Sequence, residues 1–407
     1  MNVKQIVVNP ILYLTLACYV GEATLSTIGI PIGINASVMY LLFFISMVLI
    51  VNKNIRKIQR MDIISILYLY IIIRNFPSNI TDAEAYWLPN LITFFMIVLL
   101  CKCKIRAGQY SEFFRITYGF LLILMVLGIV KAILVGGRLA VFGGPNGFYK
   151  FCMLFHSLSF TRLLFEKNRK YIIGMALGII LALLTGSKGA IISILVLIPL
   201  EYYIFVLQTK QIREVINKFL KVLFVILVLA IIGIFLVNKV PALSNALNRA
   251  MGILGSDRSK LTSVSSRVHL WELSIDYFKQ SPIIGKGARY LYYDTLGSGD
   301  PQPYAHNVFF EMLGEQGIIG FTLFLLVIYR MLRAFKGLGI RNKYAVNCFL
   351  GFIVYFIGAQ FSGNILDTKM VLFYAEMMIV LNNGNLYDMT DFEDNAFYVL
   401  ETVNFVK

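Results

Sequence analysis

The run VLFVILVLAIIGIFLV at residues 222–237 decides the fold class. It contains no charged and no hydrogen-bonding side chain. A helix that crosses a bilayer needs about 20 mostly apolar residues. The run also lacks the alternation of apolar and polar residues that is typical of a β-barrel strand. It therefore predicts a membrane-spanning helix.

The composition of the whole chain agrees with this prediction. Of its 407 residues, 58% are apolar and 14% are charged, and the mean hydropathy is +0.75. A water-soluble globule would have to expose too much of this apolar surface, and a disordered or collagen-like chain is excluded for the same reason. The net charge is +15, but no compact basic domain lies outside the apolar runs, which argues against nucleic acid as a partner. We expect an all-α polytopic membrane protein.

Twelve segments are apolar enough to be candidate spans, although the third, seventh and twelfth are short. They lie near residues 6–20, 34–51, 61–73, 86–100, 113–135, 148–165, 171–184, 188–207, 217–237, 305–332, 344–363 and 370–382. The N-terminus lacks a small-residue cleavage site, so we expect no removed signal peptide.

The distribution of Lys and Arg orients these spans. With the N-terminus in the cytoplasm, the connections that fall inside carry 20 Lys and Arg residues, in 51–60, 101–106, 162–170, 210–221 and 330–343. The short outer connections carry only 4, which are Arg74, Arg138, Lys188 and Lys369. Basic residues concentrate in cytoplasmic loops. We therefore expect twelve spans with both ends of the chain in the cytoplasm.

This topology divides the chain into four parts. Residues 1–237 hold spans one to nine, 238–304 form a long external loop, 305–382 hold spans ten to twelve, and 383–407 form an acidic cytoplasmic tail. A long loop on a membrane protein is a candidate functional region.

The external loop is rich in basic residues, which favours an anionic ligand there. Segment SSRVHLWELSIDYFKQSP (265–282) reads as an amphipathic helix that Ser265 or Ser266 caps and that ends before Pro282. Arg267 and Trp271 share one side of it, whereas His269 points elsewhere. An arginine on such a surface helix suits a lipid-linked phosphate.

Two further features of the outer face leave alternatives open. The glycines of PIIGKGARY (282–290) either end the helix or let the backbone approach an anion beside Arg289. The scattered cations Arg74, Arg138 and Lys369 are compatible with a second phosphate group.

A proton acceptor is available where the loop enters the tenth span. Neutral imidazole accepts protons near neutral pH, so His306 is the candidate base, and Asn307 can cap the helix that follows. Asp294 and Asp300 are the next candidates. His156, inside the sixth span, is expected to be a packed, hydrogen-bonded residue.

A rival site is the pair Asp82 and Glu84 in another outer loop. Such D-x-E pairs hold a divalent metal in some lipid-linked glycosyltransferases. Here Tyr86 and Trp87 follow, which is typical of an interfacial anchor. We therefore expect no metal.

Six short motifs occur in order between residues 140 and 330. They are GPN (144–146), LTGSKGA (184–190), SSRVHLWE (265–272), P-x-x-G-x-G (282–287), HN (306–307) and E-x-x-G-x-x-G from Glu311. Together they resemble the O-antigen ligase/polymerase superfamily of bacterial envelope glycan enzymes. One departure is Lys188, at a position where the family often has Arg. Lys keeps the positive charge but lacks the planar fork that makes two parallel hydrogen bonds.

The resemblance implies a GT-C-like helical fold in the inner membrane, with the active site facing the periplasm. The donor glycan would be carried on undecaprenyl pyrophosphate. His306 would act as the catalytic base, and Arg267, Arg289, Lys188 and Arg138 would bind the pyrophosphate, with no cofactor. The expected partners are the lipid-linked oligosaccharide, the bilayer and a chain-length regulator protein.

Two activities share these motifs. A polymerase adds the growing chain to a lipid-linked repeat unit, whereas a ligase transfers it to lipid A–core. We favour the polymerase because such enzymes are numerous, although no residue separates the two. A transporter of lipid-linked sugars is a third hypothesis, but it needs no base at His306 and would more often show interrupted helices in matching halves.

Overall fold

The computed structural model describes residues 63–74, 107–134, 139, 141, 144–209, 262–287, 290–294, 305–361 and 369–382. Every regular element among them is a helix. The helices are α4 (Ile63–Arg74), α7 (Ala107–Leu134), α8 (Gly144–Glu166), α9 (Tyr171–Leu184), α10 (Lys188–Thr209), α13 (Thr262–Gln280), α14 (Tyr290–Asp294), α15 (Val308–Leu338), α16 (Lys343–Ala359) and α17 (Lys369–Asn382). The predicted all-α class is confirmed for this part of the chain.

Eight of the twelve predicted spans coincide with these helices, in the same order. The first, second, fourth and ninth spans, including the run 222–237, lie outside the described residues. Three helical segments are long and apolar enough to cross a membrane, namely Tyr110–Leu134, Lys188–Gln208 and Val308–Leu338. Two shorter apolar helices are Tyr171–Leu184 and Lys343–Ala359. The chain is thus a helical membrane protein, and the count of twelve stays a prediction.

The outward faces of the long helices are apolar. Ile133 and Leu134 of α7 are 73% and 75% exposed, and Ile173 of α9 and Leu195 of α10 are similarly open. Such surfaces are unfavourable in water but match the hydrocarbon interior of a bilayer. Lipid contact therefore explains why these helices need no amphipathic pattern.

Helix α8 is buried on all sides from Gly147 to Thr161, because it packs against α7, α9, α10 and α16. Its buried residues include His156, Ser157 and Ser159, whose side chains hydrogen-bond to neighbouring helices. Polar residues inside a bundle are tolerated when they find such partners. The polar residues of α8, which lower its hydropathy, are thus explained by its central position in the bundle.

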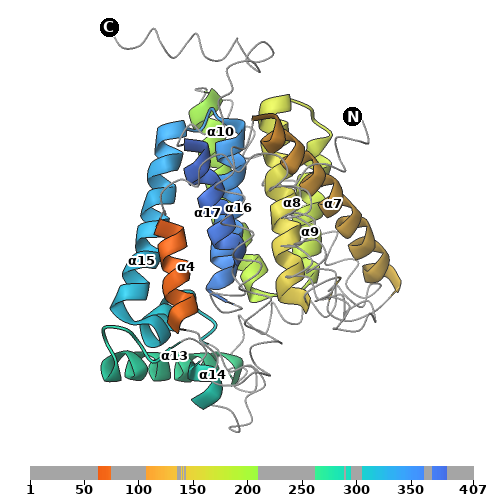
Figure 1. The fold of residues 1–407 in the computed structure, drawn as a ribbon. Coiled ribbons are helices and arrows are strands. Elements are labelled where there is room, and N and C mark those ends of the chain that lie inside the picture. The colour runs from red at the N-terminus through yellow and green to blue at the C-terminus, as the bar shows by residue number, and fades with distance from the viewer. Residues whose placement is uncertain are drawn as a thin grey trace, which may run out of the picture.

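Helices α13 and α14 lie across one end of the bundle, which we call the α13 end (Figure 1). The last turn of α4 and the first turns of α8, α10 and α15 also reach this end. At the opposite end, the Lys343 ammonium of α16 contacts the Glu166 carboxylate of α8 at 3.1 Å. Among the described residues, the predicted inner connections 162–170 and 330–343 therefore lie at the end opposite α13, whereas the turn between α9 and α10 lies at the α13 end.

One helix boundary differs from the predictions. Helix α13 begins at Thr262, so Ser265 and Ser266 lie within its first turns and neither is the N-cap. Serine inside a helix costs only a fraction of a kcal/mol, roughly 0.5, so a serine pair does not fix a helix start. Helix α15 begins after Asn307 and bends at Gly317, whose φ is 63°. The short helix α14 was not predicted.

Candidate functional site

Helix α13 is fixed to the start of α15 by its apolar side. Leu270 and Tyr277 are buried in a small cluster with Leu291 and Ala305. The indole N–H of Trp271 donates to the carbonyl oxygen of Ala305 at 2.7 Å. The Trp271 ring also stacks on Phe310, with 5.1 Å between ring centroids. The predicted apolar side of the 265–282 segment therefore packs on protein.

His306 lies between two anchored residues. Ala305 is held by Trp271, and the Asn307 side chain accepts hydrogen bonds from the backbone N–H groups of Phe309 and Phe310, which confirms the predicted cap. The His306 side chain is buried and its φ is 54°, in the left-handed region. Non-glycine residues adopt this conformation rarely, and such strain concentrates at functional sites. Helices α13 and α15 thus fix the backbone on both sides of His306.

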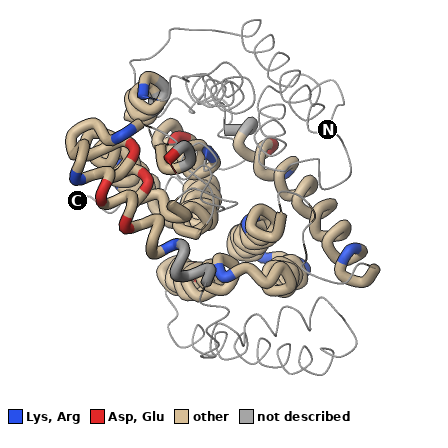
Figure 2. The backbone as a smooth tube through the Cα atoms, turned by 90° about the horizontal axis from the view of Figure 1, so that it is seen from below, with Lys and Arg blue, Asp and Glu red and all other residues tan. Residues whose placement is uncertain are grey.

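Two of the predicted phosphate-binding residues lie within electrostatic range of each other. Arg267 lies one turn before Trp271 on the same side of α13, and it is half-buried. Lys188 opens α10 and lies close enough to Arg267 for their positive charges to repel. Seen from the α13 end, Lys and Arg positions lie on several separate helices (Figure 2). A pair of neighbouring cations favours an anion between them.

Arg138 and Arg289 lie outside the described residues, as do Asp82, Glu84 and Asp300. Within the described residues, no group of three or more His, Cys, Asp or Glu is placed to hold a metal ion. Lys369, at the start of α17, is buried.

The GPN and LTGSKGA motifs meet in front of α10. The Ser187 hydroxyl donates to the Asn146 side-chain oxygen at 2.8 Å. Thr185 donates through its hydroxyl to the carbonyl of Ala182, and it accepts from the Ser187 N–H. These contacts form the turn between α9 and α10, and they set the position from which Lys188 starts.

The P-x-x-G-x-G and E-x-x-G-x-x-G motifs also meet, through their backbones. The N–H groups of Lys286 and Gly287 donate to the carbonyls of Gly314 and Glu315, at 3.1 and 2.8 Å. The Gly285 N–H donates to Ser281 at 2.9 Å, which ends α13. The alternative in which these amides bind an anion is wrong, because all three already donate to protein carbonyls. Their glycines end the helix and allow close backbone packing.

Helix α4 contributes to this junction in a way that the sequence did not reveal. The Arg74 guanidinium donates to the Gly285 carbonyl at 2.8 Å, and the Tyr70 hydroxyl donates to the Gln316 carbonyl at 2.9 Å. One donor of the Arg74 guanidinium thus holds the loop, and its expected role at a second phosphate stays a prediction. A polar residue at the end of an apolar helix gave no signal of this long-range contact.

Asp294, a reserve candidate for the base, is engaged by α13. Its carboxylate accepts the hydrogen bond of the Tyr277 hydroxyl. Burial, followed by the adjacent Asp294 carboxylate, raises the pKa of Tyr277 well above its usual range. The Tyr277 phenol therefore stays protonated, and the contact ties α14 to α13.

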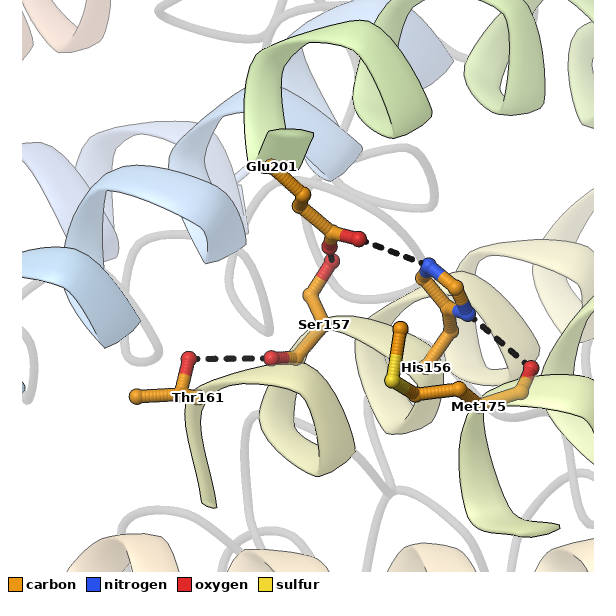
Figure 3. Close-up of polar contacts among 5 residues, drawn as sticks. All are labelled: His156, Ser157, Thr161, Met175 and Glu201. Atoms are coloured by element: carbon orange, nitrogen blue, oxygen red, sulfur yellow. Dashed lines mark hydrogen bonds and ion pairs between the residues drawn. The ribbon is translucent and has the colours of Figure 1, made fainter. Parts of the chain in front are cut away.

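His156 lies far from this site, in a polar cluster that joins three helices (Figure 3). Its Nδ1 donates to the Met175 carbonyl at 2.9 Å, and its Nε2 lies 2.8 Å from a carboxylate oxygen of Glu201. The Ser157 hydroxyl donates to the other oxygen of Glu201 at 2.8 Å. Glu201 is 13 residues along α10 from Lys188, or about 20 Å at 1.5 Å per residue. The expected packed, hydrogen-bonded role of His156 is confirmed.

The donors in this cluster determine its proton count. Because Nδ1 donates to a carbonyl, Nε2 and the Glu201 oxygen share one proton between them. The pair is thus neutral overall, either as an imidazolium with a carboxylate or as an imidazole with a carboxylic acid. A neutral pair suits a buried position between helices.

Comparison with known proteins gives one family. A search of curated proteins finds no match. A family model described as O-antigen ligase matches residues 173–325, from α9 to the middle of α15. The matched part includes Lys188, Arg267, Arg289 and His306, but neither Arg138 nor the GPN motif. Residues 173–325 are therefore similar to the O-antigen ligase family, which agrees with the resemblance of the motifs to the O-antigen ligase/polymerase superfamily.

Proposed function

We propose that this chain is a membrane glycosyltransferase that uses a glycan carried on undecaprenyl pyrophosphate, without a metal ion. The observation that carries the proposal is the arrangement at the α13 end. A buried histidine with strained backbone lies at the start of α15, on the segment that α13 anchors. Helix α13 also carries Arg267, which lies near enough to Lys188 for their positive charges to repel. The His306 imidazole suits removal of a proton, and the two cations suit a diphosphate leaving group.

The proposed reaction needs only these groups. An acceptor sugar hydroxyl attacks the anomeric carbon of the donor glycan, and His306 takes the hydroxyl proton. The bond between the anomeric carbon and the pyrophosphate oxygen breaks. Arg267 and Lys188 stabilise the negative charge that develops on the leaving lipid pyrophosphate, and we assign the same role to Arg289 and Arg138. A fixed cationic environment for developing charge is typically a large term in catalysis.

The proposal places the α13 end at the periplasmic face of the inner membrane. The excess of Lys and Arg in the predicted inner connections supports this orientation. Single cysteines introduced at Ser298 and Asn54 test it with a membrane-impermeant thiol reagent. We expect labelling from outside at position 298 and none at 54, and the reverse pattern would contradict the topology and the site together.

The acceptor separates two versions of the function. The sequence led us to favour a polymerase, whose acceptor is another lipid-linked repeat unit and whose partner would be a chain-length regulator protein. The description of the matched family favours a ligase, whose acceptor is lipid A–core. Both versions use the same donor, base and cations.

The purified full-length protein, supplied with lipid-linked repeat units, tests both versions. Chains longer than one repeat from this donor alone would support the polymerase. Product that forms only after lipid A–core is added would support the ligase. Movement of the lipid-linked sugar between leaflets without a new glycosidic bond would contradict glycosyl transfer and support a transporter.

A further inference from the structure

A second charged site lies at the opposite end of the bundle, away from the α13 end. A pocket of about 160 Å³ opens there between α7, α8 and α16. We call it the Arg162 pocket. Its lining includes the cations Arg115, Arg162 and Lys343 and one carboxylate, Glu166. Pockets for drug-sized ligands usually measure about 300–1,000 Å³, so this one suits a small charged group.

Arg162 is held firmly at the pocket wall. Its guanidinium carbon lies 4.2 Å from the centroid of the Tyr118 ring, and its Nη1 donates to the Tyr171 hydroxyl at 3.3 Å. A guanidinium has five N–H donors in a planar fork, so this bond leaves others for an oxyanion. An arginine that is already positioned by aromatic rings loses little conformational freedom when a ligand binds.

Lys343 is held at the same pocket from the other side. Its ammonium contacts Glu166 at 3.1 Å, and Glu166 also accepts a hydrogen bond from Tyr171 at 2.7 Å. Arg115 is more exposed and lies 3.8 Å from Glu112. Arg162 and Lys343 are therefore the two cations that best serve a ligand in the pocket.

Asn347 gives an independent indication of a ligand. It is only 3% exposed and lines the pocket. Its side-chain oxygen accepts no hydrogen bond from the residues that the structure describes. A buried acceptor without a donor costs free energy, so such a group is expected to meet a ligand or a water. The ligand should thus combine an oxyanion for the cations with a donor for Asn347.

From these contacts we infer that the Arg162 pocket binds a phosphate ester that carries its own hydrogen-bond donor, such as the glycerol or ethanolamine headgroup of a phospholipid. The phosphate oxygens bind Arg162 and Lys343, and a headgroup hydroxyl or ammonium donates to Asn347. The stacked rings of Phe114 and Tyr344, 6.4 Å apart, supply an apolar wall for the glycerol backbone. By the predicted topology the pocket lies at the cytoplasmic leaflet, where basic pockets between helices bind lipid headgroups.

The test uses the full-length protein in detergent, exposed to a mixture of phosphatidylglycerol and phosphatidylcholine. Native mass spectrometry measures which lipids are retained. We expect the wild-type protein to retain phosphatidylglycerol preferentially, and Arg162→Gln and Lys343→Gln each to reduce its retention about tenfold, the usual effect of losing a charge-assisted hydrogen bond. Asn347→Ala should reduce it less.

The matched controls are Arg333→Gln and Lys336→Gln, which remove exposed cations of α15 outside the pocket. Equal retention by the pocket variants and these controls would overturn the inference. Because Arg162 also packs on Tyr118, Lys343→Gln keeps the test valid if Arg162→Gln fails to fold. Inorganic phosphate that displaces the lipid at millimolar concentration, from the wild type alone, would identify a free phosphate as the occupant. Lipid retention unaffected by inorganic phosphate would identify the headgroup.

Discussion

The two ends of the bundle both carry Lys and Arg, but their cations have different neighbours. At the Arg162 pocket, Lys343 contacts Glu166 and Arg162 lies over the Tyr118 ring. At the α13 end, Lys188 and Arg267 come from different helices and lie near enough for their positive charges to repel. Bringing two cations together is unfavourable unless an anion joins them. The two ends therefore differ in what surrounds their cations: a carboxylate and aromatic rings at the Arg162 pocket, and a second cation from another helix at the α13 end.

Removal of the imidazole at the α13 end should have the largest effect. A well-placed general base contributes about 10²–10⁴-fold to rate, so His306→Ala should lose glycan transfer by that factor while donor binding is largely kept. Transfer from lipid-linked donor by the purified protein measures this. His269→Ala, at an exposed position of α13, is the control and should keep full activity. Near-normal transfer by His306→Ala would show that another residue is the base, and Asp300 would be the first alternative.

The cluster midway between the two ends should control stability rather than chemistry. Glu201→Ala leaves His156 and Ser157 without their partner, and breaking a buried pair in this way typically costs about 3–5 kcal/mol. Glu201→Gln should cost much less, since its amide can donate to Nε2 of His156 and still accept from Ser157. Thermal unfolding in detergent compares the two. Equal destabilisation would show that the cluster needs an ionised carboxylate.

Loss of one cation from the α13 end should reduce transfer by a smaller factor. A hydrogen bond to a charged group contributes about 1.5–3 kcal/mol, so Lys188→Gln and Arg267→Lys should each reduce kcat/KM about 10- to 100-fold. Arg267→Lys tests whether the planar fork matters. Lys279→Gln, which removes an exposed cation paired with Asp276 on the same helix, is the control. Wild-type turnover in Arg267→Lys would contradict a role for the Arg267 fork in binding the pyrophosphate.

The smallest effect is expected at the rim of the Arg162 pocket, and it depends on pH. Burial raises the pKa of Glu166, but hydrogen bonds from Tyr171 and Lys343 outweigh it, so the pKa is lowered from 4.5. A carboxylate with a lowered folded-state pKa stabilises the protein above pH 4.5, and this contribution disappears as pH falls through the folded-state value. An exposed ion pair is worth about 0.2–1 kcal/mol.

Melting temperatures of wild-type protein and Glu166→Gln, measured from pH 7 to pH 3, check this prediction. The difference between them should be constant at the upper end of that range and shrink as the pH falls below 4.5. Glu272→Gln, at an exposed position of α13, controls for the general loss of a negative charge. A difference that is independent of pH would contradict the assigned role of Glu166.

Much of the candidate site was predictable because it depends on local chemistry. The amphipathic segment after residue 262, the cap at Asn307 and the loop-to-helix position of His306 follow from residue types within a few positions of each other. The hydrogen-bond partners of Arg74 and of the glycines at 285 and 287 were not predictable. Their partners lie in distant parts of the chain, and no local pattern specifies which carbonyl a guanidinium or an amide will meet.

Residue patterns alone predicted the helical class of the described residues and the places of eight helices among them. Inside a bilayer, every backbone N–H and C=O must be satisfied within the segment, so a long apolar run has one outcome, and the predicted seventh span coincides with α9. The meeting of distant motifs came instead from helix packing: Asn146 contacts Ser187, Trp271 contacts Ala305, and Lys188 lies within electrostatic range of Arg267. The physical reason is that helix packing in lipid depends on the shape of whole surfaces and on a few long-range hydrogen bonds, and neither has a local signature.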